Sequence, residues 1–338
     1  MRFGPRPPAE ALGGTLAHAL RVGDLRLAKG TVLDARAVAR LLEHSVGRVE
    51  VAMPEPGDVG EDEAAHRCAA ALLSGGGLTA DPPGTGRVNL RAARAGLLVP
   101  GRAEVDRLNA IDPRLTVATL AEGRVAEGEL VATVKVIPFH VAGSLVERWE
   151  AAASSEALRV APWTGSRVAH VSTVLPGLKT GVLDKTRRAL AARLEGTGAT
   201  LGEERRVPHA REPLAEALKD VTGDATEEAP DLVLVFGASA VTDGADVVPA
   251  AVEAAGGTIE RVGMPVDPGN LLVLGHLGRT PLIGAPGCAR SPARNGFDTV
   301  LDRALAGLEV AGDEIARMGV GGLLKEIPSR PRPREAGT

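Results

Sequence analysis

The chain has 338 residues, of which 44% are hydrophobic and 24% charged, as in an ordinary globular protein. A formal net charge of −4 and an aromatic content of 2% argue against a basic, base-stacking surface, so we expect no nucleic-acid partner. No apolar run approaches the roughly 20 residues of a membrane span, and the first residues lack a signal-peptide core, so we expect no membrane partner. The two cysteines form neither a metal-binding motif nor a disulfide framework, which predicts a reducing, cytoplasmic environment.

The N-terminal half alternates helical and strand-like patterns. An Ala- and Leu-rich segment at residues 9–19 predicts a helix. Residues 34–43 carry apolar side chains at helical spacing behind Asp34, which predicts a helix capped by that aspartate. Composition shifts divide the whole chain into four regions: an α+β region at 1–58, a middle α+β region with a linker helix at 59–158, an α/β domain at 159–310, and a C-terminal helix with a frayed tail at 311–338.

The C-terminal half alternates short apolar strands with helices. Strand patterns and helical patterns follow one another along the chain, with strands at 167–173, 232–236, 272–275 and 281–283 and helices at 184–195, 212–219 and 293–308. This alternation predicts an α/β fold with a doubly wound, mostly parallel sheet, preceded by a smaller α+β N-terminal region. Ligands of such sheets bind beyond the carboxyl ends of the strands, so we expect the loops after Thr173, Phe236 and Ile283 to meet at one crevice.

A turn of small residues follows the most apolar strand. Gly237, Ala238 and Ser239 let a ligand approach the backbone closely, and the serine adds a hydroxyl group. Asp243 and Asp246 come next, immediately before a predicted helix. A strand end, a tight turn and a helix N-terminus together are typical of an anion-binding site. The alternative interpretation is an ordinary strand–turn–helix connection, in which the aspartates only cap the helix.

A second loop, at residues 175–181, contains glycine and one lysine. Lys179 lies in this loop, and Lys185 follows on the first turn of the predicted helix. Such an arrangement is suited to a phosphate group, although the spacing is not that of a Walker A motif. The alternative is a surface loop with ordinary solvated lysines.

Several motifs resemble those of a known family. Residues 167–308 resemble the molybdopterin-binding domain shared by molybdopterin adenylyltransferases and molybdopterin molybdenumtransferases, through GASAVTDGADVVPAAVEAAGG at 237–257 and IGAPGCARSP at 283–292. The whole chain is similar to the molybdopterin-binding region that some bacteria fuse to a molybdenum cofactor cytidylyltransferase. The matching stretches are LPGLKTGVLDKT at 175–186, EERRVPH at 203–209, GMPVDPGNLL at 263–272, GCARSPARNGFD at 287–298 and MGVGGLLKEI at 318–327.

The resemblance implies a site for molybdopterin, a pterin phosphate. Its catalytic carboxylates are expected to be Asp246 and Asp243, and Asp246 is the expected ligand of Mg²⁺ in a step that uses a nucleotide or molybdate. The residues expected to bind the cofactor lie on the strand ends and loops of the C-terminal half: Ser172, Thr173, Lys179, Lys185, Gly237, Ala238, Ser239, Pro268, Gly269, Asn270, Pro286, Gly287 and Ser291.

The sequence also departs from the family pattern. The family's acidic pair after the first strand is missing, and a second acidic position aligns with His209. The family segment Lys-Pro-Gly-Lys-Pro is replaced by DPGNL at 267–271. Each exchange of a lysine for an aspartate turns attraction for an oxyanion into repulsion, on the order of several kcal/mol at about 4 Å before screening.

Three hypotheses follow from the retained pocket and the depleted charges. The first is a binding, carrier or regulatory module that works with a separate cytidylyltransferase or molybdoenzyme. The second is a transferase of molybdenum cofactor biosynthesis that uses Asp246 with Mg²⁺. The third is a generic nucleotide-binding domain. The family's metal-inserting members build their site between subunits, so the resemblance also implies a homo-oligomer.

Overall fold

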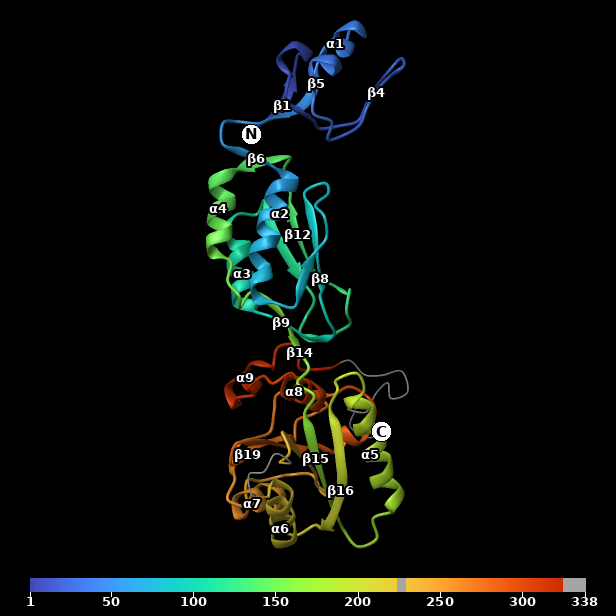
Figure 1. The fold of residues 1–338 in the computed structure, drawn as a ribbon, viewed down its shortest axis with the longest axis vertical. Helices are drawn as coiled ribbons and strands as arrows, with labels where there is room; N and C mark the ends of the chain where they lie inside the picture. The colour runs from blue at the N-terminus through green and yellow to red at the C-terminus, as the bar shows by residue number, and fades with distance from the viewer. Residues whose placement is uncertain (224–228, 325–338) are drawn as a thin grey trace, which may run out of the picture. The chain divides into compact units, whose positions relative to one another are not determined.

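The structure is a computed structural model that describes residues 1–223 and 229–324. The chain divides into two compact units, Met1–Pro162 and Trp163–Thr338, which are coloured from blue to green and from green to red in Figure 1. The finer division into four regions remains a prediction, and the predicted tail at 327–338 lies outside the described residues. None of the helices within the described ranges is long and apolar enough to cross a membrane.

The N-terminal unit begins with a small antiparallel sheet and one helix. The helix α1 (Ala35–Glu43) starts where predicted, because the Asp34 carboxylate accepts a hydrogen bond from the amide of Ala37 at 2.7 Å. The predicted helix at 9–19 is wrong, since Gly13 adopts a φ of +80° and ends the helical path after one short turn. The other elements of this region are β1 (Arg2–Arg6), η1 (Pro8–Glu10), β2 (Thr15–Leu16), β3 (Leu20–Val22), β4 (Leu25–Leu27) and β5 (Val49–Met53), with sheet orders β1-β5-β2 and β3-β4.

The rest of the N-terminal unit packs helices against small antiparallel sheets around its own core. Trp149, Leu90 and Leu108 are fully buried in that core. The sheets have the orders β10-β12-β8-β7, β11-β9-β14 and β13-β6. The elements are β6 (Asp58–Gly60), α2 (Glu61–Leu72), η2 (Leu73–Gly75), β7 (Leu78–Ala80), β8 (Arg87–Ala92), β9 (Gly96–Pro100), α3 (Arg102–Ile111), β10 (Leu115–Thr119), β11 (Gly123–Val125), β12 (Leu130–Val136), β13 (His140–Ala142), α4 (Gly143–Ala152) and β14 (Leu158–Pro162).

The C-terminal unit is a mixed α/β domain built on a six-stranded sheet. Its strand order is β16-β15-β17-β20-β19-β18, and the first four strands of that order run parallel. The last two run antiparallel to their neighbours, a reversal that the sequence did not predict. The strands are β15 (Arg167–Val174), β16 (Thr200–Pro208), β17 (Leu232–Phe236), β18 (Thr258–Val262), β19 (Val273–Leu277) and β20 (Thr280–Ala285).

Helices pack on both faces of this sheet. The helices are α5 (Thr180–Leu194), α6 (Arg211–Thr222), α7 (Val247–Ala254), α8 (Gly296–Leu305) and α9 (Gly312–Arg317), with a short turn η3 (Gly287–Arg290) before α8. The strand β17 is buried throughout, and its side chains alternate between the two faces. Leu234 and Phe236 pack with α5 and α8, whereas Val233 and Val235 pack with α6 and α7. The sheet therefore forms the middle layer, and its strand ends and loops are the parts open to ligands.

Two helix starts differ from their predicted positions. The helix α5 begins one turn earlier than expected, so Lys179 is its N-cap residue rather than a loop lysine. The closing helix was predicted from residue 293, but α8 begins only after Asn295, whose side chain forms a capping box with Asp298. Both shifts change which backbone amides lie at the ends of the parallel strands.

Candidate ligand-binding site

The carboxyl ends of the four parallel strands lie side by side, as the order of the sheet requires. The loops that follow β15, β17 and β20 leave the sheet at this edge, which we call the rim. The rim is the expected place for a ligand in a sheet of this kind. Hydrogen bonds between these loops show which predicted residues actually come together.

Thr173 is the centre of the first group of contacts. Its fully buried hydroxyl oxygen accepts a hydrogen bond from the amide of Ala238 at 2.7 Å and lies 2.8 Å from Nδ1 of His209. Because a buried hydroxyl proton needs an acceptor, Thr173 donates to Nδ1, and the ring proton of His209 is then on Nε2. Thr173 and Ala238, both predicted, are thus in direct contact. His209 was not among the predicted binding residues, although it follows the end of β16.

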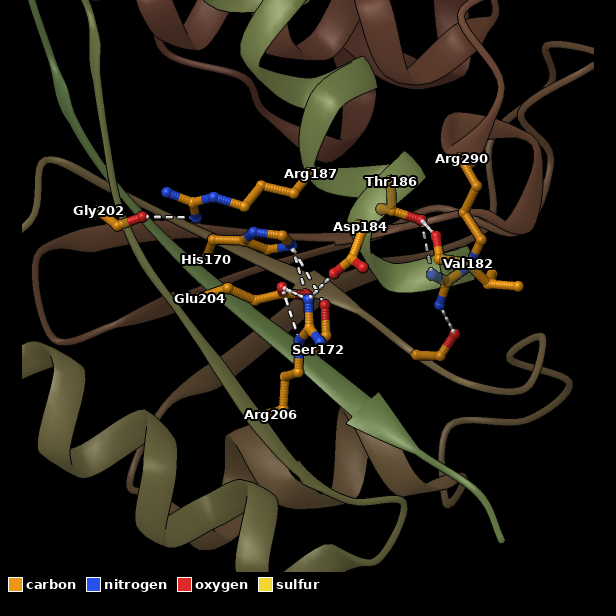
Figure 2. Close-up of polar contacts among 11 residues, drawn as sticks. His170, Ser172, Val182, Asp184, Thr186, Arg187, Gly202, Glu204, Arg206 and Arg290 are labelled. Atoms are coloured by element: carbon orange, nitrogen blue, oxygen red, sulfur yellow. Dashed lines mark hydrogen bonds and ion pairs between the residues drawn. The ribbon is translucent and has the colours of Figure 1, made fainter. Parts of the chain in front are cut away.

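Arg290 joins the third loop to the other two. Its Nη2 donates to the carbonyl oxygen of Gly237 at 2.8 Å, and its Nη1 donates to the hydroxyl of Thr186 at 3.0 Å. The guanidinium carbon lies 5.8 Å from the ring centre of Phe236. Burial lowers the pKa of Arg290 from its usual range. Figure 2 shows Arg290 reaching from its loop toward the start of α5. Arg290 was not among the predicted residues, although it is the only cation in the motif at 283–292.

The two predicted catalytic aspartates cap the turn that leads into α7. The oxygens of Asp246 accept hydrogen bonds from the amide of Val247 at 2.7 Å and from the amide and hydroxyl of Thr242 at 3.1 and 3.3 Å. These bonds, first of all the one from Val247, lower the pKa of Asp246. Asp243 accepts from the amide of Ala245 at 2.8 Å. The capping interpretation therefore describes the geometry of both carboxylates.

The donor set fits a magnesium ion poorly. Mg²⁺ requires near-octahedral oxygen ligands, and both oxygens of Asp246 already accept hydrogen bonds. Within residues 1–223 and 229–324, no three His, Cys, Asp or Glu side chains are grouped to hold a metal ion.

The remaining predicted residues fall into two further sets. Ser172 is fully buried, and its hydroxyl lies 3.2 Å from Nε2 of His170, so its side chain faces the interior rather than the rim. Lys179, Lys185 and Ser239 are exposed, the lysines on the first turns of α5 and the serine on the turn after β17.

The loop of Pro268, Gly269 and Asn270 packs against the start of α8 instead. The carbonyl oxygen of Pro268 accepts from the amide of Gly296 at 2.8 Å. Gly269 has a φ of +140°, and a Cβ atom there would lie 2.8 Å from the Cα atom of Gly296, so only glycine fits. Asn270 is exposed, and its carbonyl oxygen accepts from the amide of Met264 at 2.9 Å.

Three predicted residues lie in the segment that follows β20. Pro286 is buried, whereas Gly287 is exposed and opens the turn η3. The carbonyl oxygen of Ser291 accepts from Nη2 of Arg193 at 2.7 Å, and Arg193 also pairs with Asp298 at 2.7 Å. This segment is therefore held to α5 and α8 by one well-paired arginine.

A second polar cluster lies in the interior, next to the rim. His170 is fully buried in β15, and its Nε2 lies 3.9 Å from an oxygen of Glu204. Arg206 pairs with Glu204 and Asp184, both at 2.6 Å, as Figure 2 shows. Burial lowers the pKa of His170 to about 4, so its ring is neutral at pH 7. Nδ1 of His170 and Oε1 of Glu204 are buried without a hydrogen-bond partner in the described part of the chain.

Two hollows lie at the amino ends of the strands, opposite the rim. One, of about 770 Å³, is lined by the first residues of β15 and β16, and another, of about 520 Å³, by residues at the starts of β17 and β20. None of the rim residues lines either hollow. We base the candidate site on the polar contacts of the rim, because ligands of parallel sheets bind at the carboxyl ends of the strands.

The fold and the rim define a class: an α/β domain whose loops gather hydroxyl, imidazole and guanidinium groups at the carboxyl ends of parallel strands. Residues 163–307 match the model of a family described as a probable molybdopterin binding domain. The match lies within the C-terminal unit and agrees with the resemblance of its motifs. No curated protein matches the chain.

The solved structures that are similar to the chain include three proteins, each at low overall superposition. A molybdopterin biosynthesis protein MoeA from Pyrococcus horikoshii is 13% identical over 90% of this chain and 75% of its own, with a TM-score of 0.30. A molybdopterin biosynthesis enzyme MoaB from Thermus thermophilus is 20% identical over 42% of this chain and 97% of its own, with a TM-score of 0.29. A molybdenum cofactor biosynthesis protein from Pyrococcus furiosus is 13% identical over 91% and 66%, with a TM-score of 0.25.

Proposed function

We propose that the C-terminal unit binds molybdopterin at the rim and that the protein acts in molybdenum cofactor biosynthesis or handling. The observation that carries the proposal is the family match over residues 163–307, which spans the sheet and the loops of the rim. The sheet, with helices on both faces, serves in this proposal as a doubly wound scaffold that presents those loops.

The ligand contacts come from the turn after β17 and from the start of α5. Gly237, Ala238 and Ser239 leave room for the cofactor close to the backbone, since Ser239 is exposed and the other two are partly exposed. Lys179 and Lys185 supply positive charge beside the same edge. The loop of Pro268 and Asn270 and the segment with Pro286, Gly287 and Ser291 border the pterin in this proposal.

The depleted acids favour binding and transfer to a partner over chemistry within this chain. Asp246 is engaged as a helix cap, and the residues around it do not supply a magnesium site. The partner is a separate cytidylyltransferase or a molybdoenzyme, and the protein works as a homo-oligomer. The alternative is a transferase that adenylylates molybdopterin or inserts molybdate with Asp246, Asp243 and Mg²⁺.

Titration of the purified chain with molybdopterin tests the proposal. Ser239→Trp fills the space beside the turn and should weaken binding at least tenfold. Ser74→Trp is the matched control, because Ser74 is an equally exposed serine in the N-terminal unit. Absence of molybdopterin binding to the unmodified chain overturns the proposal.

A second assay separates carrier from enzyme. The chain is incubated with molybdopterin, ATP and Mg²⁺, and the products are separated by chromatography. We expect unchanged molybdopterin. An adenylylated product that disappears in Asp246→Asn would instead establish the transferase.

A further inference from the structure

Arg193 and Arg206 of the C-terminal unit have carboxylate partners, and Arg290 differs from them. Arg193 pairs with Asp298 at 2.7 Å, and Arg206 pairs with Asp184 and Glu204 at 2.6 Å. Arg290 forms no ion pair with any described residue, although most of its side chain is covered. A covered guanidinium without a counter-charge is costly, because a buried charge needs pairing.

The contacts of Arg290 fix its orientation but leave much of its capacity unused. It donates to the carbonyl oxygen of Gly237 and to the hydroxyl of Thr186. Thr186 in turn donates its own proton to the carbonyl oxygen of Val182 at 2.9 Å, so its oxygen can only accept from Arg290. A guanidinium has five N–H groups, and two of them are used here. The other three are held in place by these two bonds and by the ring of Phe236.

The surroundings of Arg290 do not neutralise its charge. His170 packs edge-on against the same Phe236 ring, and it is uncharged at neutral pH because burial lowers its pKa to about 4. Glu204 is the acid that acts on Arg290 from a distance, but its carboxylate is bound by Arg206. The nearby start of α5 adds positive character, since Lys179 provides no side-chain cap for the first amides of that helix.

We propose that Arg290 is the anchor for the phosphate group of a phosphate monoester bound at the rim. A planar guanidinium presents paired N–H groups that match two phosphate oxygens, and its pre-set orientation lowers the cost of binding. The inference rests on the proposed function for the identity of the ligand as molybdopterin, but the phosphate chemistry is common to nucleotides and inorganic phosphate.

The test asks whether the side chain of Arg290 binds the phosphate group of the ligand. Affinities are measured for molybdopterin and for its dephosphorylated form, with unmodified protein, Arg290→Met and Arg290→Lys. We expect loss of the phosphate to weaken binding to the unmodified protein about tenfold to a hundredfold, as for a charge-assisted hydrogen bond. In Arg290→Met the two ligands should bind equally, and Arg290→Lys should recover part of the difference.

Arg206→Met is the matched control, because it removes the same charge from an arginine that already has carboxylate partners. It should retain the preference for the phosphorylated ligand. Thermal unfolding of each variant verifies that the domain remains folded, and Arg290→Lys keeps the test valid if Arg290→Met does not fold. Equal losses for both ligands in Arg290→Met would overturn the inference, since Arg290 would then act only on the fold.

Phosphate compounds other than molybdopterin test the role of Arg290 independently of the proposed function. The ³¹P resonances of inorganic phosphate and of AMP are followed with increasing protein in phosphate-free buffer. Broadening that Arg290→Met abolishes supports the anchor even if molybdopterin does not bind, and a response to AMP alone indicates a nucleotide. Absence of any response to these probes and to molybdopterin overturns both proposals.

Discussion

The strand β15 carries two hydroxyl–histidine contacts that differ in almost every respect. In the interior, Ser172 lies 3.2 Å from His170, and both side chains are fully buried. At the rim, one residue further along, Thr173 lies 2.8 Å from His209, whose ring is partly exposed. Successive strand residues face opposite sides of a sheet, so Ser172 shares the face of His170 and Phe236, whereas Thr173 points to the other face.

The two clusters also handle charge differently. Arg206, on the solvent side of the interior cluster, is neutralised because Glu204 and Asp184 bind it. The rim holds Arg290 only through a carbonyl oxygen and a hydroxyl. Polar groups in the first cluster serve the fold, whereas those in the second retain capacity for a ligand. The two clusters differ in whether the arginine has a carboxylate partner. An arginine with such a partner stabilises the fold, whereas one without it can still bind a ligand.

The largest expected effect is the loss of stability in acid that His170 causes. Burial lowers the pKa of this histidine from 6.5 to about 4, against the opposing influence of Glu204 and in the same direction as Arg187, Arg290 and Arg206. The unfolded chain therefore binds a proton more readily than the folded one. The stabilising contribution is complete above pH 6.5 and is lost as the pH falls toward 4, by about 3 kcal/mol in total.

Urea unfolding between pH 7 and pH 4.5 measures this loss. His170→Gln should flatten the decline of the free energy of unfolding relative to the unmodified chain. Ser172→Ala is the control, because it removes the neighbouring hydroxyl and keeps the ring buried, so the decline should remain. Identical pH profiles for the unmodified chain and His170→Gln would show that His170 does not cause the loss of stability in acid.

Thr173→Val tests the rim cluster and should have the next largest effect. The variant keeps the shape of the side chain but leaves the amide of Ala238 without its acceptor and His209 without its hydroxyl partner. Stranding a buried donor costs about 1–3 kcal/mol, and we expect about 2 kcal/mol in the free energy of unfolding at pH 7.

Imidazole ¹⁵N chemical shifts give an independent measurement of the same contact. In the unmodified chain they should show the proton of His209 on Nε2, and Thr173→Val should produce a mixture of the two tautomers. A single unchanged tautomer in Thr173→Val would mean that the hydroxyl does not position the ring.

Much of the fold follows from local signals. Asp34 caps its helix as predicted, and Asp246 caps α7 as in the alternative interpretation, because a cap depends only on the next few residues. The strand Leu232–Phe236 is predicted by its continuous apolar run. The reversed strand β19 was not predicted, since direction depends on partners remote in sequence. The helix expected at 9–19 shows that Ala and Leu cannot compensate for a glycine pair within the segment.

Less of the candidate site could be predicted from the sequence. Thr173 and Ala238 were predicted from motifs at strand ends, and a hydrogen bond between them joins positions 65 residues apart. His209 and Arg290 were missed because their partners lie 36, 53 and 104 residues away. The alternation along β15 contained one usable signal, because Ser172 and Thr173 must face opposite sides of the sheet.

The smallest expected effect distinguishes the two roles of Asp246, which lies at the rim but is engaged like an interior group. Asp246→Ala removes the cap of α7 and should lower the free energy of unfolding by about 1 kcal/mol at pH 7. Asp246→Asn should cost less than that, because its single amide oxygen keeps the hydrogen bond from Val247 whereas its NH2 group cannot accept from the amide of Thr242. Urea unfolding of both variants measures the difference.

The same variants also test whether Asp246 takes part in ligand binding. The hydrogen bonds that lower the pKa of Asp246 stabilise its ionised form. Their contribution to the free energy of unfolding is therefore present above the pKa that Asp246 has in the unfolded chain, and it is lost on acidification. If the carboxylate is only a cap, Asp246→Asn should bind molybdopterin like the unmodified chain, both with Mg²⁺ and with EDTA. A loss of affinity confined to Asp246→Asn in Mg²⁺ would give the aspartate a role in holding the metal and would move it into the ligand-binding cluster.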